Sequence, residues 1–220
     1  MSSYPAGSFL AQLGEDDRRR LLDAGRPLRI PAGASLLFEG DLSDRVVLVL
    51  RGTARIFATA ANGRQVLIAI TGPGEILGEM SALDGRPHSA SVVALDEIDA
   101  VLLADGDFRA ILAANASIAI AVAIRLTREL RRGMHQRTEL VAYDVPARLA
   151  AALVELHDRL APGDGPFEAP ISQREIAEWC GASREAVTKA LARFRSCGWV
   201  RTGRRSITVL DVEALRARAS

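Results

Sequence analysis

One stretch, ISQREIAEWCGASREAVTKALARFRSCGWV at residues 171–200, constrains the fold more than any other part of the chain. Ser172 and Glu175 have the spacing of a capping box, so a helix begins there. Gly181 suits the backbone of a tight helix stop, and Ser183 suits the cap of a second helix. Two helices joined by so short a turn predict a helix-turn-helix motif.

The second of these helices has an apolar side and a polar side. Apolar residues at the helical period indicate the buried side: Val187, Ala190, Leu191 and Phe194. The polar side carries Arg184, Glu185, Thr188, Lys189 and Arg193. An arginine can donate two hydrogen bonds to one guanine, a glutamate can accept from a cytosine amino group, and a lysine reaches a further base or a phosphate. We therefore expect Arg184, Glu185 and Lys189 to read bases.

A basic hairpin follows the helix pair. Residues 198–210, GWVRTGRRSITVL, predict a strand, a turn with three arginines, and a second strand, which is typical of a wing. We expect phosphate contacts from Ser172, Arg174, Ser183 and Arg204. Charge agrees with this, because residues 145–220 carry 12 basic and 9 acidic side chains, whereas residues 1–112 carry 11 and 15. The partner predicted for the C-terminal part is double-stranded DNA.

The first half of the chain has a different pattern. Short β-type runs punctuated by glycines fill residues 27–104 and predict a small antiparallel barrel, or jelly roll. Asn62 and Gly63 stand between two such runs and predict a hairpin turn. Residues 8–24 are expected to form one short amphipathic helix before the roll. The fold class predicted for the whole chain is thus α+β.

A long helix is predicted to join the two parts. Residues 115–142 contain no proline and one glycine, Gly133. Apolar residues recur along it at steps of three and four: Ile120, Ala123, Leu126, Leu130, Met134 and Val141. A coiled coil with a second copy would bury this stripe, so we expect a homodimer through residues 115–142, although packing on its own roll is the alternative. The expected domains are 1–112, 113–143 and 144–220.

Several other classes of protein are excluded. Cys180 and Cys197 are too few for a disulfide framework, a metal site or an iron–sulfur cluster. His88, His135 and His157 lie in separate segments, and neither a nucleophile motif nor a phosphate-binding loop accompanies them, so no enzyme, catalytic residue or metal is expected. Apolar runs are too short for a membrane span and no signal peptide is visible, which favours a cytoplasmic protein without membrane contact.

Taken together, these patterns resemble the Crp/Fnr superfamily of bacterial transcription regulators and are similar to actinobacterial cyclic-AMP receptor proteins. The resemblance covers nearly the whole chain. It rests on IPAGASLLFEGD (30–41), VLRGTARI (49–56), GEMSALDGRPHSASV (78–92), DVPARLA (144–150) and GASREAVTKAL (181–191). It implies an N-terminal β-roll, a central dimerisation helix and a C-terminal winged helix-turn-helix. It further implies a homodimer that reads a palindrome with TGTGA-like half-sites, and RNA polymerase as a partner if the protein is an activator.

The same resemblance assigns an effector pocket to residues 78–92, which we call the cassette. Gly78 and Glu79 fall where the family contacts the ribose and phosphate side of a cyclic nucleotide. His88 stands where the family has a phosphate-binding arginine, followed by Ser89 as the hydroxyl neighbour. A histidine is mostly neutral at pH 7 and lacks the planar fork that holds a phosphate.

Positions on the central helix that contact the adenine in the family hold Gly133 and Met134, which offer no side-chain hydrogen bond. Both departures together predict weak binding of cyclic AMP, so that a cyclic nucleotide is only a possible ligand and no cofactor is certain. Two modes of action then remain: the roll binds another ligand, or it serves as a scaffold and the dimer binds DNA without a ligand. The alternatives are a true cyclic-nucleotide-activated receptor and a β-roll module whose helix-turn-helix binds protein.

Overall fold

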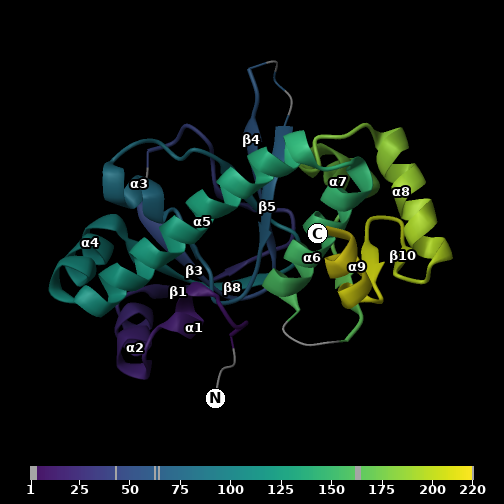
Figure 1. The fold of residues 1–220 in the computed structure, drawn as a ribbon. Coiled ribbons are helices and arrows are strands. Elements are labelled where there is room, and N and C mark those ends of the chain that lie inside the picture. The colour runs from purple at the N-terminus through teal and green to yellow at the C-terminus, as the bar shows by residue number, and fades with distance from the viewer. Residues whose placement is uncertain (1–3, 43, 62, 64, 162–164, 220) are drawn as a thin grey trace. The chain divides into compact units, whose positions relative to one another are not determined.

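The computed structural model describes residues 4–42, 44–61, 63, 65–161 and 165–219, and only the backbone of residues 137–141. These residues form two compact units, 1–129 and 130–220, each of which is described by itself. Figure 1 traces the chain through both units. The long helix α5 contributes its first part to one unit and its last part to the other.

The first unit is built on two antiparallel four-stranded sheets, which confirms the predicted roll. One sheet has the order β1 (Arg26–Ile30), β8 (Ile98–Ala104), β3 (Arg45–Arg51) and β6 (Ile76–Leu77). The other has the order β2 (Ser35–Leu37), β7 (Ser91–Ala94), β4 (Ala54–Thr59) and β5 (Gln65–Thr71). Alternate side chains of the strands fill the interior of the roll, among them Val47, Val49, Leu77, Val92 and Ala94.

Strands β4 and β5 form the predicted hairpin, with Ala54 opposite Thr71 and Thr59 opposite Gln65. Gly63 has a φ of +78°, and its N–H donates to the Ala60 carbonyl at 2.8 Å. Asn62 lies outside the described residues. A positive φ is what a glycine at this turn supplies.

The prediction of a single helix over residues 8–24 is wrong, because this segment forms two helices: α1 (Phe9–Gln12) and α2 (Glu15–Asp23). The backbone becomes extended at Leu13 and Gly14. Arg18 stabilises this break, since its guanidinium donates to the Leu10 carbonyl at 2.9 Å and to the Leu13 carbonyl at 3.0 Å. In one continuous helix, backbone N–H groups would donate to these carbonyls; here the Arg18 side chain donates to them instead.

Two more helices flank the roll, α3 (Glu79–Asp84) and α4 (Asp105–Ala114), and α5 (Ala116–Ala142) follows as one helix of 27 residues. Ile118, Ala121 and Val122 are buried with core residues of the roll and of α1 and α4. Packing on its own roll therefore accounts for one side of α5. No single helix among the described residues is long and apolar enough to cross a membrane; α4 and the start of α5 qualify only as a pair bent by 112°.

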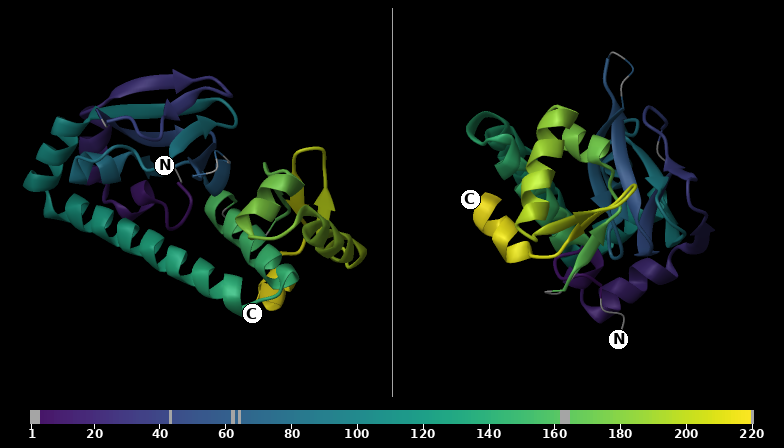
Figure 2. Two further views of the ribbon diagram at one scale, coloured as in Figure 1. Left: turned by 90° about the horizontal axis from the view of Figure 1, so that it is seen from above. Right: turned by 90° about the vertical axis from the view of Figure 1, so that its right-hand side faces the viewer.

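The other side of α5 carries exposed members of the predicted apolar stripe, whereas Leu126 of that stripe is half-buried against the core of the first unit. Ile120, Leu130 and Met134 expose 58%, 66% and 62% of their surface. The side chain of Val141 lies outside those described. Figure 2 shows α5 running without a break between the two units. An exposed stripe of this length on one helix is what a partner helix would cover.

The second unit is a winged helix-turn-helix, as predicted. Its elements are α6 (Val145–Leu160), β9 (Phe167–Ala169), α7 (Gln173–Trp179), α8 (Arg184–Ser196), β10 (Val200–Thr202), β11 (Ile207–Val209) and α9 (Val212–Ala219). The strands form an antiparallel sheet in the order β10-β11-β9. Helix α6 packs against α7, α8 and α9. Strand β9 and helix α9 were not predicted.

Candidate nucleic-acid interface and effector cassette

The turn between α7 and α8 has the predicted geometry. Ser172 and Glu175 form a complete capping box: the Ser172 hydroxyl accepts from the Glu175 N–H at 3.2 Å, and a Glu175 carboxylate oxygen accepts from the Ser172 N–H at 2.9 Å. Gly181 has a φ of +59°, and the Ala182 N–H donates to the Ala177 carbonyl at 2.9 Å. These bonds fix the direction in which α8 leaves the turn.

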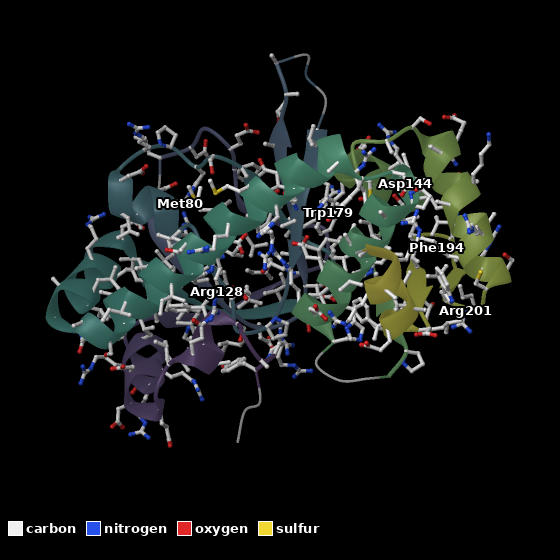
Figure 3. All side chains as sticks on the ribbon, viewed as in Figure 1. Met80, Arg128, Asp144, Trp179, Phe194 and Arg201 are labelled. Carbon is white, nitrogen blue, oxygen red and sulfur yellow. The ribbon has the colours of Figure 1, made fainter. Side chains whose placement is uncertain are left out.

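Helix α8 is anchored on its inner side. Its predicted apolar residues are all buried: Val187, Ala190, Leu191 and Phe194. The ring of Phe194 lies 5.3 Å from that of Trp199, centroid to centroid (Figure 3 labels Phe194). Arg184, Glu185 and Lys189 are all exposed on the other side. The structure therefore brings the three predicted base-reading residues together on the first two turns of one rigid helix.

Local hydrogen bonds set the charge of Glu185. Its own backbone N–H, then the Ser183 hydroxyl and the neighbouring Arg184, lower the pKa of the Glu185 carboxyl. The carboxylate is therefore ionised at neutral pH and acts only as a hydrogen-bond acceptor. An acceptor here suits a cytosine amino group and disfavours bases that present only acceptors.

The four predicted phosphate contacts differ in what they offer. Arg174 and Arg204 are exposed, Arg174 with an ion pair to Glu178 at 3.3 Å and Arg204 in the turn of the wing. The hydroxyl groups of Ser172 and Ser183 are already engaged in the caps of α7 and α8. The wing strand β10 adds an exposed cation, Arg201 (Figure 3). The arginines, rather than the serine hydroxyls, are the better placed groups for phosphate.

In the first unit, the cassette folds as a tight loop around α3. Gly78 has a φ of +84°, and a Cβ there would come within 2.9 Å of the Arg45 carbonyl oxygen. The cassette is tied to the loop after β2, because the His88 N–H donates to the Asp41 carbonyl at 2.8 Å and the Gly40 N–H to the His88 carbonyl at 2.9 Å. These two hydrogen bonds hold the end of the cassette against the loop that follows β2.

His88, which the resemblance places at the position of a phosphate-binding arginine, is buried in the cassette. It exposes only 7% of its surface, and its Cε1 lies 3.5 Å from where a Cβ on Gly78 would stand. The hydrogen bond from Arg45 is the main cause that lowers the pKa of the nearby Asp44 carboxyl, and a positive charge on His88 is the smallest cause. Ser89, in contrast, is exposed. The cassette thus holds a buried imidazole beside Gly78, and an imidazole lacks the planar fork by which a guanidinium binds phosphate.

Glu79 forms an ion pair with Arg125, a residue that the sequence analysis did not predict. It is 5% exposed, and the Nη1 of Arg125 on α5 donates to its Oε1 at 2.6 Å. The same guanidinium donates from Nε to Glu75 Oε2 at 3.2 Å and from Nη2 to the Ile76 carbonyl at 3.0 Å. The only signal in the sequence was one arginine in an otherwise apolar run of α5.

The pKa values of this pair follow from its burial. Burial raises the pKa of Glu79, and Arg125 only partly offsets this effect. Burial works to lower the pKa of Arg125, but Glu79 and Glu75 outweigh it, so the Arg125 pKa is raised. The guanidinium therefore stays charged and ties α5 to the start of the cassette.

The predicted effector residues are not all brought together within one unit. Gly133 and Met134 belong to the second unit, whereas Gly78, Glu79 and His88 belong to the first. Gly133 and Met134 are both exposed on α5, and a Cβ on Gly133 would meet no atom within 4 Å. Among the described residues, no group of His, Cys, Asp and Glu side chains could hold a metal ion.

A β-roll followed by a long helix and a winged helix-turn-helix defines a class of regulators with an effector-type domain and a DNA-binding domain. Comparison with family models agrees: residues 27–115 match the cyclic nucleotide-binding domain, and residues 147–218 match the Crp-like helix-turn-helix domain. The chain belongs to the Crp/Fnr superfamily of transcription regulators.

Its relatives support this assignment. The CRP-like cAMP-activated global transcriptional regulator of Mycobacterium tuberculosis is 34% identical over 197 residues, 88% of each chain. The solved catabolite activator protein of Thermus thermophilus is 31% identical, covering 96% of this chain and 97% of that one, with a TM-score of 0.56. FixK2 from Bradyrhizobium japonicum, 21% identical over 89% of this chain and 98% of its own, has a TM-score of 0.77 and shows the fold alone. The Mycobacterium tuberculosis relative is a transcriptional regulator, which agrees with the predicted class of protein.

Proposed function

We propose that this chain is a homodimer that reads a DNA palindrome with TGTGA-like half-sites. The outer side of α8 carries the proposal, because Arg184, Glu185 and Lys189 are exposed on one capped helix whose inner side is buried. The Arg184 guanidinium would bind guanine O6 and N7, and the ionised Glu185 would accept from a cytosine amino group. Lys189 lies one turn later and would reach the next base or a phosphate.

The exposed stripe on α5 supports dimerisation through residues 115–142. Ile120, Leu130 and Met134 would be buried against the same helix of a second copy. The two copies of α8 would then enter successive major grooves, about 34 Å apart, on double-stranded DNA. In this proposal residues 1–112, 113–143 and 144–220 act as effector-type, dimerisation and DNA-binding parts. RNA polymerase is the further partner if the protein activates transcription.

Binding of a labelled palindromic duplex, followed by fluorescence anisotropy over a salt series, tests the proposal. We expect the wild type to prefer the TGTGA palindrome over a scrambled duplex, with affinity falling as salt rises. Arg184→Ala should lose about 10-fold or more of that preference. The matched control is Arg19→Ala, which removes an exposed arginine of the first unit. A wild type without salt-sensitive preference for any such palindrome would refute the proposal.

We further propose that the DNA-bound form does not require cyclic AMP. Two features of the cassette support this proposal: His88 is a buried imidazole where the resemblance expects a guanidinium, and Oε1 of Glu79 is engaged by Arg125. Gly133 and Met134 add no hydrogen bond for a base. The β-roll would then either bind a ligand of another kind or serve as a scaffold without a ligand.

A second candidate is a cyclic-AMP-activated receptor. The match of residues 27–115 to the cyclic nucleotide-binding domain favours it, as does the name of the Mycobacterium tuberculosis relative. Titration calorimetry with cyclic AMP and cyclic GMP separates the two. We expect wild-type dissociation constants weaker than about 1 µM and tighter binding by His88→Arg, which restores the charge–phosphate contact. Submicromolar binding of cyclic AMP by the wild type would establish the second candidate.

A further inference from the structure

One hydrogen bond links the two helices of the DNA-binding motif on their outer side. The hydroxyl of Thr188 on α8 donates to Oε1 of Gln173 on α7 at 3.3 Å. Thr188 is exposed, and Gln173 is partly exposed at the first position of α7. A threonine in a helix commonly turns its hydroxyl back to the carbonyl four residues earlier. Here the hydroxyl is directed to the neighbouring helix instead.

Thr188 lies among the residues that the proposed function assigns to base reading. It is four positions after Arg184 and three after Glu185, so the three side chains share one side of α8. The Cβ of threonine carries two branches that diverge, a hydroxyl and a methyl group. The hydrogen bond to Gln173 restricts the rotamer of Thr188. Because the two branches diverge from one Cβ, the methyl group cannot face Gln173 at the same time as the hydroxyl.

We propose that Thr188 is a further specificity-determining residue, whose methyl group contacts the 5-methyl group of a thymine in the major groove. Gln173 is its positioning residue and acts through the hydrogen bond. A threonine methyl against a thymine methyl is an apolar contact by which a protein can recognise this base. TGTGA-type half-sites contain such thymines, so the inference rests on the proposed function and deepens it.

Operators in which single thymines are replaced by deoxyuridine test this contact, because deoxyuridine differs only by the missing methyl group. We expect one thymine position at which the wild type binds the thymine duplex about fourfold more tightly than the deoxyuridine duplex, the effect of burying one methyl group. In Thr188→Ser, which keeps the hydroxyl, this ratio should fall to about one while binding to the deoxyuridine duplex is unchanged.

Gln173 is tested by the same ratio rather than by affinity alone. In Gln173→Ala the side chain of Thr188 is released, so the ratio should fall toward one. In Gln173→Glu the acceptor is kept, so the ratio should be retained, although the added negative charge weakens binding to every duplex alike. The control is Thr127→Ser, a threonine of α5 whose hydroxyl donates to the Ala123 carbonyl at 2.8 Å; its ratio should equal that of the wild type.

Two results would overturn the inference, and they are distinguishable. If the wild type binds the palindrome but Thr188→Ser leaves the ratio unchanged at every thymine, Thr188 does not read a methyl group and the proposed function stands. If the wild type binds no palindrome, the proposed function and this inference both fail.

Discussion

At the scale of single residues, Arg125 places a charged group inside the first unit. Its guanidinium is largely buried and is satisfied by Glu79, Glu75 and the Ile76 carbonyl. Removing one partner of a buried ion pair leaves a charge without compensation, whereas removing both is far less costly. The ion pair therefore ties α5 to the start of the cassette.

Arg125→Met should lower the free energy of unfolding by about 3–5 kcal/mol, because Glu79 is left buried without its partner. The double variant Arg125→Met, Glu79→Gln should recover part of this loss. Equilibrium denaturation of the full chain measures both. A double variant no more stable than Arg125→Met would show that Glu79 is not the charge that needs Arg125.

The raised pKa of Glu79 predicts a pH dependence. The pKa of Glu79 is higher in the folded protein than in the unfolded chain, where it is about 4.3. The protonated carboxyl therefore adds to the free energy of unfolding below about pH 4.3. This contribution is lost as the pH rises through the folded pKa. Glu79→Gln has no such group. The unfolding midpoint of Glu79→Gln relative to wild type should therefore rise between about pH 4.3 and pH 7. A relative midpoint that falls over this range would mean that Arg125 lowers the pKa of Glu79 below its ordinary value.

Residue roles were predictable where they depend on local pattern. Arg184, Glu185 and Lys189 follow from the helical period and the cap at Ser183, which are set within one helix. The pair of Arg125 and Glu79 could not be found this way. Its members are 46 positions apart and meet only because α5 packs on the roll.

At the scale of elements, α5 makes the sharpest prediction. Leu130→Asp should shift the chain from dimer to monomer at micromolar concentration, because the aspartate would place a charge in the apolar seam. Leu130→Met is the matched control and should remain dimeric. Sedimentation velocity measures both. A dimeric Leu130→Asp, or a monomeric wild type, would contradict dimerisation through this stripe.

The elements themselves were predicted unevenly. The roll, the long helix and the helix-turn-helix carry strong periodicity, turn residues and caps, and the structure confirms them. Residues 8–24 were predicted as one helix, because the apolar spacing does not show that Arg18 reaches back to cap the end of α1. Strand β9 has three residues, too few for a period to be visible, and it forms only by pairing with β11.

At the scale of the whole molecule, the family is established and the effector is the open chemical question. The relatives named above include one called cAMP-activated, and the matched domain is called cyclic nucleotide-binding. Against this stand the buried imidazole of His88 and the engagement of Glu79 by Arg125. In this protein, sequence-specific DNA reading and a response to cyclic AMP are therefore separate properties, each with its own test.

Selection of binding sites from a random duplex library, by the full-length wild type with and without cyclic AMP, tests this account most directly. We expect the enriched sequences to contain two inverted TGTGA-like half-sites with centres about one helical turn apart, already without cyclic AMP. Addition of cyclic AMP should not change them or their recovery. Enrichment only when cyclic AMP is present, or enrichment of no palindrome at all, would contradict the account.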